Sequence, residues 1–276
     1  PLDLLVRDVK AVEPNTSDTL LSLERLKVEL RLWKLLKKEV EIEEISIRNA
    51  TFDTRDFIDG IVVNGHLGEL YLESHGVVFS PETARINEFS VKNTDVSLTL
   101  ENMEDTDTTT TEPIYWKILL DEIDFENVGF ALNMPQDSLF VRTMLPKTTL
   151  KDGVIDLKEA SYYVKSFDMD NAELAYGPKE ELSLKKIGLQ LDSIYYCGKD
   201  IRANIEEFVL KERSGLELVS TEGRIVSDSV LIEIPKFTMK TTASSLDLQT
   251  KIGWDVLEMK KTGVLSGRSP PIPKRP

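Results

Sequence analysis

The chain has few of the residues on which metal and disulfide sites depend. Cys197 is its one cysteine, and His66 and His75 are its two histidines among 276 residues. A lone cysteine excludes an intramolecular disulfide and a cysteine-based structural zinc site. The histidines lie in a turn-rich segment without a companion cysteine, so they are more simply surface residues than a metal pair. We therefore expect no metal site and no cofactor.

Signatures of catalysis are also missing. We find no Ser-His-Asp arrangement, no P-loop and no Gly-rich phosphate-binding pattern. Glu41, Glu43 and Glu44 could suggest paired carboxylates. On an alternating strand, however, they are better explained as a solvated face. The sequence therefore predicts a protein that is not an enzyme.

Basic charge and long apolar runs are scarce as well. Lys and Arg number 34 against 48 Asp and Glu, for a net charge of -14. Such a balance argues against nucleic-acid binding, which needs clustered cations to neutralise phosphates. No apolar run approaches the ~20 residues of a membrane-spanning helix. The chain opens on Pro1 without Met, so we expect that a segment precedes it, and residues 266–276 predict a disordered Pro-rich tail.

What the sequence does have is a short repeat. Two apolar residues two positions apart are followed by two polar residues, the second often Asn or Asp. A second apolar pair then follows with its parity shifted by one. The clearest copies are residues 45–52, 123–130 and 167–174, and looser ones are residues 89–96, 148–155 and 237–244.

The parity shift predicts a hairpin. In the first copy, a two-residue turn at Arg48-Asn49 would pair Ile47 with Ala50 and Ile45 with Phe52. All four side chains would then point the same way. Asn suits such a turn because it tolerates positive φ. The repeat thus predicts consecutive hairpins, each with one apolar and one charged face.

Short alternating segments with regular turn signals predict an all-β fold along the whole chain. We expect one β segment over residues 1–102, an acidic Thr-rich loop over 103–113, and a continuing β segment over 114–265. Two architectures fit the pattern. A sandwich would close two apolar faces together, whereas one elongated, curled antiparallel sheet would keep an apolar concave face.

Two blocks resemble the AsmA/TamB family. In residues 20–50, a strand leads to a Leu-rich stretch, taken as a helical turn at 33–37, and then to the pattern Ile42-x-x-Ile45-x-Ile47-x-Asn49-Ala50. Residues 115–128 resemble a second recurring element of the family, which begins at Trp116 and also follows an acidic loop. The family's inner-membrane helix and the C-terminal domain of its TamB branch have no counterpart here.

This resemblance implies a repeating β-groove of the Gram-negative envelope that moves phospholipids between the inner and outer membranes. It implies a periplasmic location with an inner-membrane anchor in the full-length protein. Its partners would be phospholipid acyl chains, both membranes and an outer-membrane assembly protein. Asp-Ser/Thr-apolar tripeptides such as Asp137-Ser138-Leu139 also resemble glycosylation sites of exported Bacteroidota proteins, although they arise freely in turns. The predicted lipid-contacting residues are Ile45, Ile47, Phe52, Phe89, Val91, Leu98, Leu100, Ile123, Phe125, Phe130, Phe167, Met169, Phe208, Leu210, Ile232, Ile234, Phe237 and Met239.

Two alternatives stay open. Alternating Ile and Leu residues usually form a core, so a second layer over these residues would leave no groove. The protein could also be a non-enzymatic scaffold in outer-membrane assembly or envelope integrity that docks partners through exposed strand edges.

Overall fold

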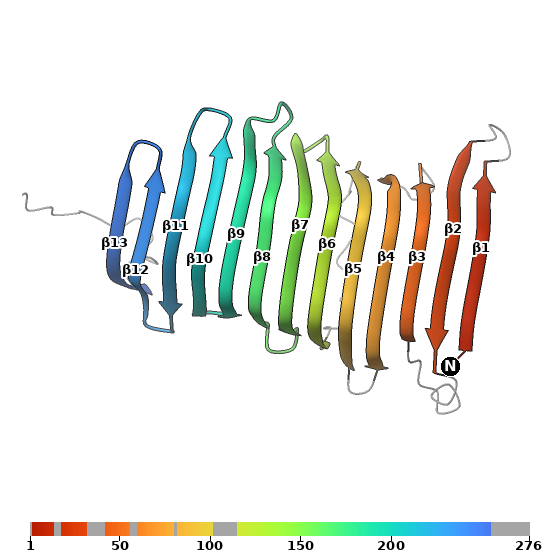
Figure 1. Ribbon diagram of the computed structural model, residues 1–276, viewed down its shortest axis with the longest axis horizontal. Coiled ribbons are helices and arrows are strands. Elements are labelled where there is room, and N and C mark those ends of the chain that lie inside the picture. Colours follow the sequence, from red (N-terminus) through yellow and green to blue (C-terminus); the bar gives the residue numbers. More distant parts are fainter. Residues whose placement is uncertain are drawn as a thin grey trace, which may run out of the picture.

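The protein is a single sheet. The computed structural model describes residues 2–13, 18–31, 42–55, 60–79, 82–101 and 115–254. All thirteen strands belong to one sheet, and their order in the sheet is their order in the sequence. Figure 1 shows them side by side, with β1 and β13 at opposite ends. The expectation of an all-β fold built from consecutive neighbouring strands is therefore confirmed.

The strands are long. Their bounds are β1 Leu2–Val12, β2 Thr19–Leu30, β3 Ile42–Asp53, β4 Ile61–Phe79, β5 Glu82–Leu100, β6 Lys117–Met134, β7 Leu139–Asp156, β8 Ser161–Tyr176, β9 Leu182–Cys197, β10 Asp200–Glu212, β11 Glu217–Ser227, β12 Leu231–Thr241 and β13 Ser245–Gly253. Most are well above the usual strand length of about five or six residues.

The expected sheet needs two corrections. It is not strongly curled, and it is mixed rather than fully antiparallel, because β5 and β6 run in the same direction. Parallel pairing places like residues of two repeat copies side by side: Phe89 faces Ile123, and Val91 faces Phe125. The predicted helical turn at 33–37, the acidic loop at 103–113 and the predicted tail lie outside the described residues. The sheet itself continues across the loop without a break.

The predicted hairpin turn at Arg48-Asn49 is wrong. β3 runs straight through it, paired with β2 on one side and β4 on the other. Asn49 does adopt positive φ, at 47°, but within a strand. A left-handed residue within a strand shifts the alternation of side chains, and the constant register around Asn49 means that β2 and β4 shift with it. We call such a shift a bulge. The pattern marks a bulge because the flanking strands hydrogen-bond β3 along its length.

Gly153 shows the shift directly. It follows Asp152, which has a φ of 51° in β7. A Cβ built on Gly153 would lie 3.3 Å from side-chain atoms of both Leu120 and Leu150. Gly153 therefore faces the same side as Leu150, three positions earlier, where strict alternation would put it on the opposite side.

The bulges line up across the sheet. Asn93 in β5 and Asn127 in β6 lie side by side, and the Asn127 Nδ2 donates to Asn93 Oδ1 at 3.3 Å. The residues concerned share a positive φ and lie at one level of strands that run in the same direction; they are Asp8, Asn49, Asn93, Asn127 and Asn171. We call this set the bulge row.

The sheet is one layer thick in the described part of the chain. Substantial contacts between elements occur only between strands that are neighbours in the sheet. The buried apolar residues are few and none of them is aromatic: Ala50, Ala84, Val91, Leu120, Ala172, Ile187 and Leu218. A sandwich would bury its large aliphatic and aromatic side chains between two layers. The sandwich alternative therefore does not describe this fold.

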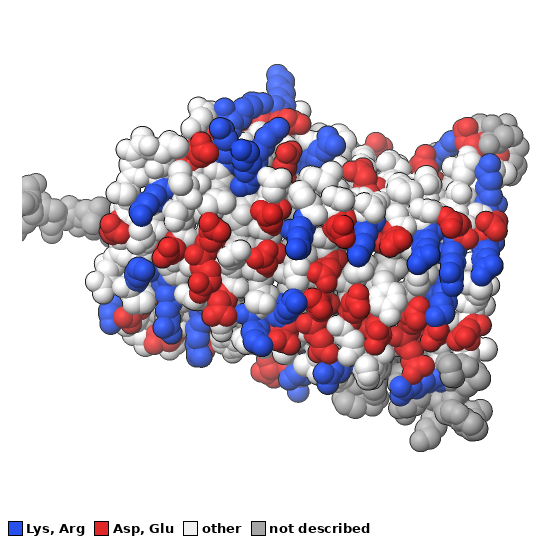
Figure 2. Space-filling view, in the orientation of Figure 1, with Lys and Arg blue, Asp and Glu red and all other residues white. Residues whose placement is uncertain are grey.

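One face is charged. In the view of Figure 2, acidic and basic side chains are interspersed over the sheet. Ion pairs link neighbouring strands, including Lys151 with Glu122 at 2.9 Å and Lys27 with Glu44 at 3.1 Å. The bond to Glu122 raises the pKa of Lys151. Such surface pairs add little stability individually, but they connect neighbouring strands on this face.

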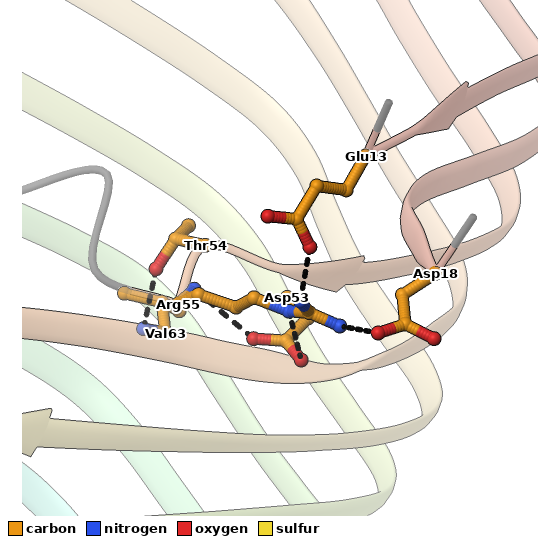
Figure 3. Close-up of polar contacts among 6 residues, drawn as sticks. All are labelled: Glu13, Asp18, Asp53, Thr54, Arg55 and Val63. Carbon is orange, nitrogen blue, oxygen red and sulfur yellow. Dashed lines mark hydrogen bonds and ion pairs between the residues drawn. The ribbon is translucent and has the colours of Figure 1, made fainter. Parts of the chain in front are cut away.

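An ion-pair cluster ties the first two strands to β3 (Figure 3). The guanidinium of Arg55, at the end of β3, pairs with Glu13 and lies 2.6 Å from Asp18, both in the β1–β2 connection. Its backbone N–H also donates to Asp53 at 3.0 Å. These contacts raise the pKa of Arg55, chiefly through the hydrogen bond to Asp18. Arg55 therefore fastens the edge hairpin to the rest of the sheet.

Candidate functional site: the apolar face

The face opposite the ion pairs is apolar, and the register shows how it is built. Residues directly opposite each other on neighbouring strands point to the same face. Following these partners from β1 to β13 gives one uninterrupted row. We call it the central apolar row: Leu4, Val28, Ile45, Leu72, Phe89, Ile123, Leu150, Phe167, Leu191, Ile205, Gly223, Phe237 and Leu248.

A second row runs beside the first. It consists of Val6, Leu26, Ile47, Leu70, Val91, Phe125, Thr148, Met169, Leu189 and Phe208. The two rows touch where the rings of Phe89 and Phe125 meet edge to face, with centroids 6.2 Å apart. Edge-to-face packing is a favoured aromatic geometry. The rows therefore form one continuous apolar band across the strands.

Only one position of the central apolar row is occupied by glycine, and there a neighbour fills the space. A Cβ on Gly223 would lie 2.7 Å from Cδ2 of Phe237, so the Phe237 ring already covers this site. The band therefore continues from β10 to β12 without an apolar side chain from β11 at this level.

Most predicted lipid-contacting residues fall on this band. Ile45, Phe89, Ile123, Phe167 and Phe237 lie in the central row, and Ile47, Val91, Phe125, Met169 and Phe208 lie in the second. The remaining ones lie beyond the bulge row or towards the strand ends. Phe52 and Phe130 lie in one row of paired residues, with Gly65 and Val96 between them. The others pair directly with residues of a neighbouring strand: Leu98 with Val63, Leu100 with Ile61, Leu210 with Leu218, Ile232 with Ile252, Ile234 with Thr250 and Met239 with Leu246.

The band is only half-buried. Of the predicted residues, Val91 is buried at 7% exposure and Phe130 is exposed at 39%, and the others lie between these classes. Side chains on an uncovered face are half-buried, because they pack against their neighbours on the same face but not against a second layer. Within the described residues, no other strand lies over it.

Several band residues were missed from sequence. Val28, Leu72, Leu150 and Leu191 lie in the central row as fully as the predicted aromatics. Plain alternation along each strand would have found them. The bulge row was missed because an Asn between apolar pairs fits a turn equally well.

The histidines and the possible metal ligands are dispersed in the described part of the chain. Among the described residues, no group of three His, Cys, Asp or Glu side chains is placed to hold a metal ion. His66 lies 3.4 Å from the Thr51 hydroxyl and His75 contacts Asn87, in separate parts of the sheet. Tyr71, on the charged face, has its pKa raised to about 12 by burial and by its hydrogen bond to Glu73.

Two hollows in the surface lie next to the bulge row. One of about 440 Å³ is lined by Ser90, Lys92, Asp124 and Lys147, next to Asn127 of the bulge row. Another of about 460 Å³ lies beside Asp8 and Asn49 of the same row. They mark where the bulges distort the sheet. The apolar side is a broad surface formed by packed side chains.

Comparison with known proteins identifies no family. The sequence matches no protein-family model, and no curated protein is significantly similar to it. Within the described residues, no helix is long and apolar enough to cross a bilayer.

Proposed function

We propose that the apolar face carries phospholipid acyl chains, as a segment of a repeating β-groove in a bridge-like lipid-transport protein of the Gram-negative envelope. The observation that supports the proposal is the central apolar row, which crosses all thirteen strands with no protein layer over it in the described part of the chain. An uncovered apolar surface of this length needs an apolar partner.

The dimensions fit lipid tails. Thirteen strands about 4.8 Å apart make the band roughly 58 Å long. A lipid tail spans half of a hydrocarbon core of about 30 Å, or about 15 Å. Several tails could therefore lie end to end along the band. Each CH₂ group that leaves water gains about 0.8 kcal/mol, so tails can be held without a specific binding residue.

The test compares the two faces. Phe125→Asp places a carboxylate in the middle of the band, and Gln190→Asp places one on the charged face of β9, beside Leu189 and Leu191. Native protein should co-purify with phospholipid, detected by mass spectrometry, and should take up a fluorescent fatty acid. Phe125→Asp should abolish uptake, and Gln190→Asp should leave it unchanged.

Circular dichroism separates an open face from a covered one. If the face is open, Phe125→Asp should keep the β-sheet spectrum, because its charge stays in contact with water. If another layer covers the face, the same variant should unfold, because a buried unpaired charge is strongly destabilising. Protein that carries no lipid and takes up no fatty acid would rule out the proposal.

A second candidate function, scaffolding in envelope assembly, has one specific observation in its favour. Edge strand β1 exposes Leu2, Leu4, Leu5 and Val12, each at more than 40%. A long edge with free backbone groups and apolar side chains is a template for pairing with another strand. Lipid-free protein that captures a β-strand peptide at β1 would support this function instead.

A further inference from the structure

In the described part of the chain, most tyrosines and both tryptophans lie at one end of the strands. We call this end the lower rim: β6, β8 and β10 begin there, and β7 and β9 end there. Directly paired residues trace it from Lys117 to Asp156, Ser161, Cys197 and Asp200. It lies at the bottom of Figure 1.

Six aromatic residues lie within three positions of these strand ends. The aromatic rim consists of Tyr115, Trp116, Tyr162, Tyr163, Tyr195 and Tyr196. Of the seven tyrosines in the chain, only Tyr71 and Tyr176 lie elsewhere. Trp254 follows β13 at the same end. Phe89, Phe125 and Phe167, in contrast, lie in the apolar band away from the rim.

The aromatic rim occupies both faces of the sheet. Tyr162 and Tyr196 are direct partners, with ring centroids 5.9 Å apart, and they continue the apolar face. Tyr163 and Tyr195 are the next pair, so they point to the opposite, charged face. Val154 is the partner of Tyr163 on that face. Side-chain alternation between apolar and charged therefore stops at this level of the strands.

The rim is exposed, and its turns carry apolar tips. Tyr115 is 51% exposed, Tyr162 41% and Tyr196 44%. Leu157, just after β7, is 37% exposed, and Val230, just before β12, is 67% exposed. Exposed apolar side chains also occur at the opposite end, such as Leu216 at 55% and Val219 at 51%, so the lower rim is distinguished by its aromatic residues.

Carboxylates at the rim have partners, as Asp200 has in Arg202 at 3.1 Å. The Asp156 carboxylate accepts the Glu159 N–H at 3.1 Å, and Asp228 accepts the N–H groups of Val230 and Leu231 at 2.7 and 2.9 Å. Cations also lie against the aromatic rings. Lys199 Nζ is 5.1 Å from the Trp254 ring centroid, and the Arg202 guanidinium is 5.5 Å from that of Tyr195.

We propose that the aromatic rim docks edge-on into the interface of a phospholipid bilayer. The argument is that the chemistry changes with depth along the strands and is the same on both faces. A bilayer surface imposes that pattern, because its polarity changes with depth. Tyr and Trp have apolar rings with a polar group, which suits the zone between headgroups and acyl chains. Exposed aliphatic tips and cations beside them fit the same zone.

This inference goes beyond the proposed function and does not depend on it. A scaffold with a lipid-free face could dock through the rim equally well. Conversely, acyl chains could occupy the apolar band of a protein that never touches a bilayer through its lower rim. Lipid uptake and vesicle binding are therefore measured separately.

The experiment is co-sedimentation with vesicles of phosphatidylethanolamine and phosphatidylglycerol. The rim variant is Tyr162→Thr with Tyr196→Thr. Its matched control is Tyr176→Thr with Leu182→Thr at the opposite end, because these two residues are also direct partners, on the same face, and are 49% and 38% exposed. We expect the rim variant to bind vesicles about tenfold or more weakly, since membrane binding scales with buried apolar area. The control should bind as wild type.

Two further measurements test whether the rim itself contacts the vesicles. Leu157→Ser with Val230→Ser changes only exposed turn tips, so it should weaken binding without affecting the fold. In a Trp33→Phe background, Trp116 and Trp254 should be quenched by brominated phospholipid. Wild-type protein that ignores vesicles would overturn the proposal, as would a rim variant that binds fully or a control that loses as much. Rim-dependent binding to a protein without vesicle binding would overturn it as well.

Discussion

Strands β3–β8 and strands β9–β13 both keep one face apolar, but they shift their side-chain alternation in different ways. In the first region, neighbouring strands shift together. The register between β3 and β4, β6 and β7, and β7 and β8 is constant through the bulge row. In the second region, the register slips within the sheet: β12 slips against both β11 and β13 next to Pro235, and β10 slips against β9 between Ile205 and Glu207 but stays in register with β11.

The difference explains which part of the sequence shows a repeat. A shift that both partners make at one level preserves the hydrogen-bond ladder, so each strand carries the same short pattern around a left-handed Asn. A one-sided bulge can occur anywhere along a strand. Among the described residues, β10, β11 and β12 contain no non-glycine residue with positive φ. Their sequences accordingly share no clear motif.

Deleting a bulge residue should separate the two regions most strongly. Without Asn49, residues 50–53 of β3 would fall out of register with both β2 and β4, which each keep one residue at this level, Glu24 and Gly68. We expect a loss of about 3–4 kcal/mol in the free energy of unfolding, because several ladder hydrogen bonds of about 1 kcal/mol each are broken. Urea denaturation measures it.

Deletion of Pro235 is the matched control. β12 has one residue more than β11 and β13 between Ile234 and Phe237, so this deletion should restore a regular ladder. We expect stability to stay within about 1 kcal/mol of wild type. Equal losses for the two deletions would show that the regions do not differ in this way.

Strands in the first region pair so closely that replacing some of their glycines with alanine should destabilise the fold. A Cβ on Gly65 would contact the Asp95 carbonyl oxygen and lie 2.9 Å from the Val96 Cα, both rigid backbone atoms. Gly65→Ala should cost about 2–3 kcal/mol, as overpacking does. In Gly129→Ala the nearest atom is the Asp95 carboxylate, which can rotate away. A urea series in which Gly129→Ala is the costlier variant would contradict this view.

The left-handed conformation itself can be tested at Asn127, which has a φ of 54°. Asn127→Val should lose about 1–2 kcal/mol, because a β-branched residue is strained there, whereas Asn127→Gly should be nearly neutral. Asn204→Val in β10, where φ is not positive, is the control and should be neutral or slightly stabilising. Thermal unfolding of the three variants gives the comparison. Equal destabilisation by Val and Gly at 127 would argue against strain.

The smallest effect concerns a turn of the second region. Hydrogen bonds from Leu231 and Val230 lower the pKa of Asp228. A carboxylate with a lowered folded-state pKa stabilises the fold above its unfolded value of about 3.9, and this contribution is lost as pH falls through the folded value. Asp228→Ala should therefore differ most from wild type near neutral pH and converge with it in acid. Urea midpoints from neutral to acidic pH test this, and a gap that widens in acid would have the wrong sign.

Much of the fold could be predicted from the sequence, because strand alternation is a local property. Ile45 with Ile47, and Ile123 with Phe125, mark the apolar face of their strands without knowledge of their neighbours. What local reasoning could not decide was the meaning of Asn49 and Asn127. A residue with positive φ can lie in a turn or in a bulge, and the pairing with neighbouring strands decides which of the two forms. The parallel pairing of β5 and β6 was missed for the same reason, although the long connection between them fits a crossover.

The candidate site, too, could be predicted from the sequence only in part. That Phe89 and Phe125 share a surface follows from the register, and alternation already indicated their faces. The aromatic rim was not predicted, because Trp116, Tyr162 and Tyr196 are far apart in sequence and each looks like an ordinary packing residue. Their grouping depends on where each strand begins and ends.

A sheet whose strands contact only their neighbours has a consequence for how it folds. Its free energy of unfolding is then the sum of a contribution from each strand and a contribution from each interface between neighbouring strands. Opening should then propagate inward from β1 and β13, each of which has a single partner, and amide exchange should slow steadily towards the middle strands. Arg55 should slow opening at the β1 end, because its ion pairs raise the free energy needed to release β1 and β2 from β3.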